Sequence, residues 1–117
     1  MRQAYAHDAV LDLPPDGDER APGGAVTMAL CGSLDHPPPC PHAPHQTSVE
    51  REGERLRVRI VFATDDEAGA RRTLEQALAT GAFTGPDGGT TRWALLSSAP
   101  ADLVDAERTL GERLVVS

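Results

Sequence analysis

The sequence predicts an α+β fold: one mainly antiparallel sheet of four to five strands, with two helices packed on one face. Three observations lead to this class. Residues 56–62 alternate apolar and charged side chains as a half-buried strand does. A helix-start signal at residues 64–67 precedes an apolar stripe with helical spacing. Turn-forming Gly and Pro residues separate these segments, and with 117 residues and no internal repeat the chain is expected to form one domain, residues 1–117.

Two strands are expected before the region rich in Cys and His. Residues 9–13 alternate weakly and predict a short strand, which the acidic, turn-rich segment 14–23 follows as a mobile loop. Residues 25–30 then form a compact apolar run, Ala-Val-Thr-Met-Ala-Leu. This run predicts a central strand that delivers Cys31 to the edge of the sheet.

Residues 47–62 carry the clearest local signal, that of a β-hairpin with a two-residue turn at Glu52-Gly53. In this register Glu50 faces Arg55, which pairs opposite charges across the strands. The second arm separates apolar from basic side chains: Leu56, Val58, Ile60 and Phe62 lie on one face, and Arg55, Arg57 and Arg59 on the other. The arginine row is a candidate anion-binding strip, but a solvated face with paired charges is the simpler interpretation.

Two helices are expected in the C-terminal half. Thr64-Asp-Asp-Glu67 has the pattern of a capping box, so a helix is predicted to begin at Thr64 and to end at Gly81. After a turn at residues 85–89, residues 91–97 predict a strand, and Pro100 is suited to the first turn of a second helix. The apolar stripes of the two helices are Ala70, Leu74, Ala77 and Leu78, and Leu103, Ala106, Leu110 and Leu114. This order of elements does not match the ferredoxin-like pattern without rearrangement.

Charge and composition exclude several classes of partner. A formal net charge of −7 opposes nonspecific binding to nucleic acid or to anionic lipid headgroups. No apolar run approaches the length of a transmembrane helix, and the N-terminal segment lacks a signal peptide, so the expected compartment is the cytoplasm. All eleven Lys and Arg positions are Arg, which we attribute to the G+C bias of a bacterial genome.

The most specific feature is a Pro-rich Cys/His loop at residues 31–46. It contains both cysteines of the chain and three of its four histidines. A reducing cytoplasm keeps thiols free, and thiolate and imidazole together favour zinc, with Cu(I) or Fe as less favoured ions. The candidate zinc ligands are Cys31, His36, Cys40, His42 and His45. A structural zinc takes four, so we expect both thiolates and two of the three imidazoles, without a choice between the histidines.

Five prolines between residues 37 and 44 bias this loop toward polyproline II, whose side chains repeat every three residues. His36, His42 and His45 would then share one face, and the loop must bend for them to reach one ion. Asp35 is placed to orient an imidazole. The spacing matches none of the common zinc-finger patterns. A redox-active or free thiol pair, or a loop without any site, are therefore the alternatives.

The sequence thus predicts a small, non-enzymatic zinc-binding domain with a structural site and a role in protein interaction or regulation. It contains no Ser/His/Asp constellation and no His-Glu-x-x-His helix. One alternative is a small zinc-dependent hydrolase with an open coordination position and Asp35 or Glu50 as base. Another is a metal carrier or sensor, because five donors around a four-coordinate ion permit exchange.

Overall fold

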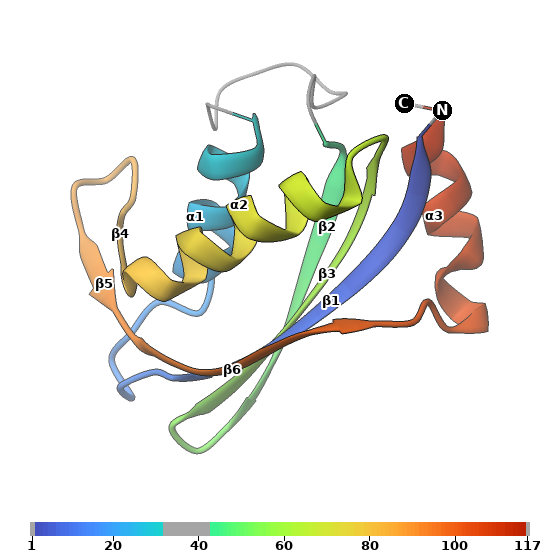
Figure 1. Cartoon of the computed structure of the whole chain (residues 1–117). Helices are drawn as coiled ribbons and strands as arrows, with labels where there is room; N and C mark the ends of the chain where they lie inside the picture. Colours follow the sequence, from blue (N-terminus) through green and yellow to red (C-terminus); the bar gives the residue numbers. More distant parts are fainter. Residues whose placement is uncertain (1, 32–42, 117) are drawn as a thin grey trace.

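The computed structural model describes residues 2–31 and 43–116 of the chain. Four antiparallel strands form the main sheet in the order β2-β3-β1-β6, and β4 and β5 form a separate short hairpin (Figure 1). The elements are β1 (Gln3–Asp12), α1 (Ala21–Cys31), β2 (His45–Glu52), β3 (Arg55–Thr64), α2 (Glu67–Thr80), β4 (Ala82–Thr84), β5 (Thr90–Arg92), β6 (Ala94–Ala101), a 3₁₀ turn (Asp105–Glu107) and α3 (Arg108–Val115).

The main sheet together with α1 and α2 has the βαββαβ order of a ferredoxin-like fold. The β4–β5 hairpin is inserted between α2 and β6, and α3 follows β6. Helices α1 and α2 lie on one face of the sheet, whereas α3 contacts β1 and β3 from the opposite face. The predicted α+β class with an antiparallel sheet is confirmed, and the structure adds a third helix to the two that were expected.

The predicted strand at residues 25–30 is wrong, because this segment belongs to helix α1. A short apolar run has no periodicity that separates a buried strand from a buried helix. The helical spacing becomes visible only when the run is extended backward, since the buried positions are Ala21, Pro22, Ala25, Val26, Leu30 and Cys31. Replacing this strand by a helix is the change that produces the ferredoxin-like order.

The β-hairpin is confirmed, but its register is shifted by two residues relative to the prediction. Glu50 lies opposite Arg57, and Glu52 lies opposite Arg55. Gly53 has a φ of 61° and is the first of the two turn residues, as in a type II′ turn. Because the shift is even, every side chain keeps its predicted face. Leu56, Val58, Ile60 and Phe62 are all buried against the helices.

Helix α2 begins slightly later than predicted and has a different cap. Its N-cap is Asp66, whose side chain accepts a hydrogen bond from the Gly69 amide at 3.1 Å. The Thr64 hydroxyl instead accepts from the Asp66 amide at 3.0 Å, so the predicted capping box is wrong. The helix ends at Gly81 as expected, in a left-handed conformation with φ 75°. Ala70, Leu74 and Leu78 form its buried stripe.

The prediction of a helix beginning at Pro100 is also wrong. Strand β6 continues through Pro100 to Ala101, and α3 begins only at Arg108. Proline is tolerated here because β6 is an edge strand, where a missing amide donor can face solvent. The expected strand at residues 91–97 is divided into β5 and β6 at Trp93, whose indole NH donates to the Leu78 carbonyl at 2.8 Å.

The arginine row lies on the outer face of the sheet, opposite α1 and α2. The register gives it acidic neighbours on both sides, Glu50 and Glu52 on β2 and Asp8 and Asp12 on β1. Arg59 binds Asp8 at 2.9 Å, Glu107 at 2.6 Å and the Asp102 carbonyl at 2.6 Å. The hydrogen bond from Arg59 lowers the pKa of Glu107. Arg59 is therefore charge-paired and attaches the segment before α3 to the sheet, whereas Arg57 has only a long contact of 3.7 Å with Glu52.

Candidate functional site

Two of the five predicted metal ligands lie within the described residues, and the structure brings them together. Cys31 is the last residue of α1, and His45 is the first residue of β2. The Cys31 Sγ lies 3.8 Å from the His45 Nδ1. His36, Cys40 and His42, together with Asp35, lie outside the described residues. The helix end and the strand start therefore form one cysteine–histidine pair at the two ends of the Cys/His loop.

The surrounding core holds both residues in place. Leu30 and Cys31 are buried at the end of α1, among the side chains of the hydrophobic core. His45 lies opposite Phe62 in the β2–β3 register, so its ring is on the face of the sheet that α1 covers. Strand alternation places Glu50 on the other face. Glu50 therefore points away from His45 and does not serve as a base beside it.

Hydrogen bonds fix the orientation and the tautomer of His45. Its Nδ1 lies 3.0 Å from the Ala43 carbonyl, and its Nε2 lies 2.9 Å from the Thr27 hydroxyl. A carbonyl can only accept, so Nδ1 carries the proton and Nε2 accepts from Thr27. The hydroxyl of Thr27 can also accept, which means that it can serve the opposite tautomer without moving.

Cys31 is disulfide-bonded in this structure. The chain has two cysteines, and the other, Cys40, lies outside the described residues. A sulfur in a disulfide is not available as a thiolate, which is the form that binds metal ions. The geometry above therefore belongs to the oxidised chain, and coordination through Cys31 requires reduction.

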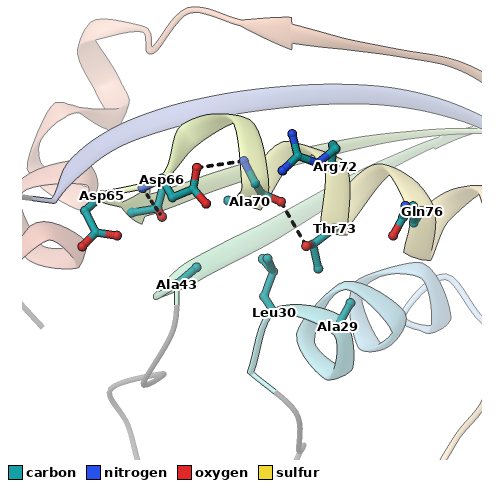
Figure 2. Close-up of a pocket in the computed structure, with 11 residues that line it drawn as sticks. Ala29, Leu30, Ala43, Asp65, Asp66, Ala70, Arg72, Thr73 and Gln76 are labelled. Atoms are coloured by element: carbon teal, nitrogen blue, oxygen red, sulfur yellow. Dashed lines mark hydrogen bonds between the residues drawn. The ribbon is translucent and has the colours of Figure 1, made fainter.

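A pocket of about 480 Å³ lies beside this pair, between α1 and α2 (Figure 2). Leu30, the residue before Cys31, and Ala43, two residues before His45, line one side of it. The other side carries polar groups from the start of α2, but two of them already make hydrogen bonds to the backbone of this helix. Asp66 caps the Gly69 amide, and the Thr73 hydroxyl donates to the Gly69 carbonyl at 3.0 Å. Acidic residues such as Asp65 and Asp66 are common at a helix start, because they complement the helix dipole. Their presence in the sequence therefore gave no indication of a pocket.

A second polar cluster lies where β1, β6 and α2 meet, around His7. His7 lies before the strand that the sequence predicts at residues 9–13, and it is fully buried in the inner strand β1. Its Nε2 is 2.7 Å from the Ser98 Oγ, and its Nδ1 is 3.0 Å from the Arg71 Nη1. Ser98 in turn donates to Glu75 at 3.1 Å. These residues are too distant in the sequence for any local pattern to reveal the cluster.

The His7 cluster does not have the polarity of a catalytic serine dyad. A guanidinium only donates, so Arg71 occupies the Nδ1 lone pair and the proton of His7 is on Nε2. His7 then donates to Ser98, whereas a serine nucleophile must donate to its histidine. His7 is fully buried, and Ser98 and Glu75 are half-buried. The cluster is therefore a hydrogen-bonded network centred on one buried histidine.

Residues 2–31 and 43–116 contain no group of three or more His, Cys, Asp or Glu residues placed to hold a metal ion. Within this part of the chain, Cys31 and His45 can thus supply two ligands at most. The same residues form no helix with the length and apolarity needed to cross a membrane.

No family model matches the chain, and neither curated proteins nor solved structures show a significant similarity to it. The ferredoxin-like order is therefore an observation of topology. Because many unrelated functions share this fold, a function must be argued from the residues themselves.

Proposed function

We propose that this chain is a small zinc-binding domain, in which the reduced Cys/His loop closes around one structural ion and presents a rigid surface to a protein partner. The observation that carries the proposal is the approach of Cys31 and His45. These residues come from different elements and are 14 positions apart in the chain. Both atoms that meet are of the type that zinc prefers.

The distance between the two atoms supports a shared ion. Zinc–sulfur and zinc–nitrogen bonds of about 2.3 and 2.1 Å at a tetrahedral angle place the two ligand atoms about 3.6 Å apart. The observed separation of Sγ and Nδ1 is 3.8 Å. After reduction of the disulfide, the pair needs only a small adjustment to bind one ion.

Thr27 supports His45 as a ligand. Coordination through Nδ1 requires that the proton move to Nε2, and the hydroxyl of Thr27, 2.9 Å away, can accept it as a hydrogen bond. Metal-bound histidines characteristically donate their second ring NH to such an oriented partner. The bond between Nδ1 and the Ala43 carbonyl would be exchanged for the bond to the metal.

The remaining two ligands are assigned from the sequence alone: Cys40 and either His36 or His42. A closed site of four protein ligands favours a structural role over hydrolysis, which needs an open position for water. The hydrolase alternative also loses one of its two candidate bases, because Glu50 lies on the opposite face from His45. Binding in a reducing compartment such as the cytoplasm is part of this proposal.

Metal stoichiometry of reduced and oxidised protein tests the proposal. Untagged protein is treated with a phosphine reductant or with a thiol oxidant, dialysed against equimolar zinc, and analysed for bound metal. We expect about one zinc per reduced chain and none per oxidised chain. Cys31→Ser and His45→Gln should each lose the zinc, whereas His7→Gln, which changes the one histidine outside the loop, should retain it. Reduced wild-type protein without stoichiometric zinc would contradict the proposal.

A second candidate function, a redox-active thiol pair, is favoured by the disulfide at Cys31. It predicts reversible oxidation in glutathione buffers without any stoichiometric metal. Thiol quantification across a series of glutathione ratios, with and without zinc, separates the two. Zinc that shifts the balance toward the reduced form supports metal binding, since it binds only the thiolates. A balance that zinc leaves unchanged supports the redox function alone.

A further inference from the structure

We propose that His7 is a proton-operated latch, which holds α2 and the edge strand β6 to the centre of the sheet while it is neutral and releases them when it is protonated. This inference depends only on described residues and is independent of zinc binding. It concerns a group that the proposed function does not use.

The latch is a continuous chain of hydrogen bonds through three elements. It begins on α2, passes through β1 and β6, and returns to α2. His7 is its central member and is fully buried. The bonds are Arg71 Nη1 to His7 Nδ1 at 3.0 Å, His7 Nε2 to Ser98 Oγ at 2.7 Å, and Ser98 Oγ to Glu75 Oε2 at 3.1 Å.

Only one arrangement of protons satisfies this chain. Arg71 can only donate and the carboxylate of Glu75 can only accept, so both ends are fixed. His7 must therefore accept at Nδ1 and donate at Nε2, and Ser98 must accept from His7 and donate to Glu75. Reversing either proton would place two donors or two acceptors in contact.

Further contacts of the Arg71 side chain hold it in place beside His7. Its Nε donates to Glu67 at 2.8 Å, and its Nη1 also donates to the Ala6 carbonyl at 2.8 Å. Its guanidinium carbon lies 5.6 Å from the centre of the Tyr5 ring and 5.3 Å from that of Phe62. The cation is thus a fixed part of the interface between α2 and the sheet.

Protonation of His7 places two N–H donors and two positive charges face to face across the 3.0 Å contact with Arg71. The charged groups around His7 are Arg71 and Glu75 from α2 and Asp8 from β1. Its register partners are Ile60 on β3 and Pro100 on β6, neither of which carries a charge. Glu75 reaches the ring only through Ser98, so no carboxylate contacts the new charge directly. The hydrogen bond between Arg71 and His7, one of the two that join α2 to β1 through this guanidinium, must break.

Burial lowers the pKa of His7, Glu75 opposes this shift, and Arg71 adds to it. The latch is consequently closed at pH values above the ordinary histidine range, near 6.5. It opens as the pH falls below that range.

Hydrogen–deuterium exchange at about pH 7.5 and about pH 5 tests the latch. After correction for intrinsic exchange, protection of α2 and β6 in the wild type should fall as the pH decreases. The fall should be up to roughly tenfold for each pH unit between about 6.5 and the pKa of His7 in the folded protein. His7→Gln offers an acceptor to Arg71 and a donor to Ser98 but cannot be protonated, so its protection should not depend on pH. Wild-type protection that is independent of pH, or a loss that persists in His7→Gln, would overturn the proposal.

The tautomer of His7 provides a test that needs no variant. In ¹⁵N spectra at neutral pH, Nδ1 should resonate as an unprotonated nitrogen and Nε2 as a protonated one. A neutral His7 protonated at Nδ1 would overturn the chain of hydrogen bonds and the latch with it, even if His7→Gln did not fold.

Discussion

At the scale of single residues, two arginines of the same row on β3 differ in how many ionic contacts they make and in how exposed they are. Arg59 has a side chain that is 25% exposed and makes charged hydrogen bonds to Asp8 and Glu107. Arg57, two residues earlier in β3, is 65% exposed and has only a long contact of 3.7 Å with Glu52. The same residue type in the same row therefore has a structural role at one position and a solvated one at the other.

Replacing Arg59 by Ala should reduce the free energy of unfolding by about 1–3 kcal/mol, because Glu107, which is largely buried, loses its partner. Arg57→Ala is the matched control and should change it by less than about 0.5 kcal/mol. Urea denaturation of both variants at neutral pH measures the difference. Equal effects of the two substitutions would show that Arg59 does not attach the segment before α3.

Thr27 is the residue through which the structure orients His45. Thr27→Val removes the hydroxyl and keeps the shape, so we expect zinc affinity of the reduced protein to fall by roughly 10–100-fold. Thr73→Val lines the nearby pocket without contacting His45 and should leave the affinity unchanged. Competition with a chromophoric chelator measures both. An unchanged affinity in Thr27→Val would exclude Thr27 as the partner of a metal-bound His45.

At the scale of elements, helix α2 depends on an N-cap that differs from the one its sequence pattern indicates. Asp66→Ala should lower the free energy of unfolding by about 1 kcal/mol through loss of the bond to the Gly69 amide. Asp65→Ala changes the adjacent carboxylate outside the cap and should have a smaller effect. Thermal denaturation followed by circular dichroism compares them. A larger effect of Asp65→Ala would mean that the helix begins elsewhere.

The elements also show where prediction from the sequence succeeded and why it failed elsewhere. Strand β3 and helix α2 have strong periodicity, so their faces were predicted correctly. Helix α1 was taken for a strand because its buried side includes small residues and a proline, which hide the helical period. Strand β6 was shortened because a proline suggests a helix start equally well as an edge strand, and only the sheet order decides between these.

The candidate site was likewise predictable from the sequence only in part. Cys31 and His45 were identified from residue type and spacing, which are local properties. The pocket beside them and the His7 cluster arise from contacts between distant segments, such as His7 with Ser98. Residue type alone assigns no partner to a single histidine in a strand, so these features required the coordinates.

At the scale of the whole molecule, stability should depend on pH through His7. The folded state lowers the pKa of His7, whereas the unfolded chain titrates near 6.5. The unfolded state therefore binds more protons between these two values, and the free energy of unfolding rises with pH across this window. The stabilisation is complete above about pH 6.5 and declines as the pH falls toward the folded pKa.

Denaturation midpoints of the oxidised protein from about pH 8 to about pH 5 measure this dependence. We expect His7→Gln to flatten the decline, because the variant has no proton to gain at this position. A decline of equal size in wild type and His7→Gln would assign the acid sensitivity to other groups.

A Cys/His loop closed around an ion, as proposed above, would stabilise a core that has few aromatic side chains. Aromatic residues make up 3% of the chain, and its core consists mainly of Leu, Val and Ala side chains. A metal ion that joins the end of α1 to the start of β2 would add stability to such a small core. In the oxidised structure, the disulfide at Cys31 constrains the same end of α1. The ion and the disulfide therefore exclude each other at one position of the fold.

X-ray absorption at the zinc edge of reduced, zinc-loaded protein tests the shared ion most directly. We predict a four-coordinate shell with about two sulfur atoms near 2.3 Å and about two nitrogen atoms near 2.0–2.1 Å. Cys31→Ser and His45→Gln, which should not retain the ion, should show no such shell. A six-coordinate shell of oxygen and nitrogen, without sulfur, would contradict the account.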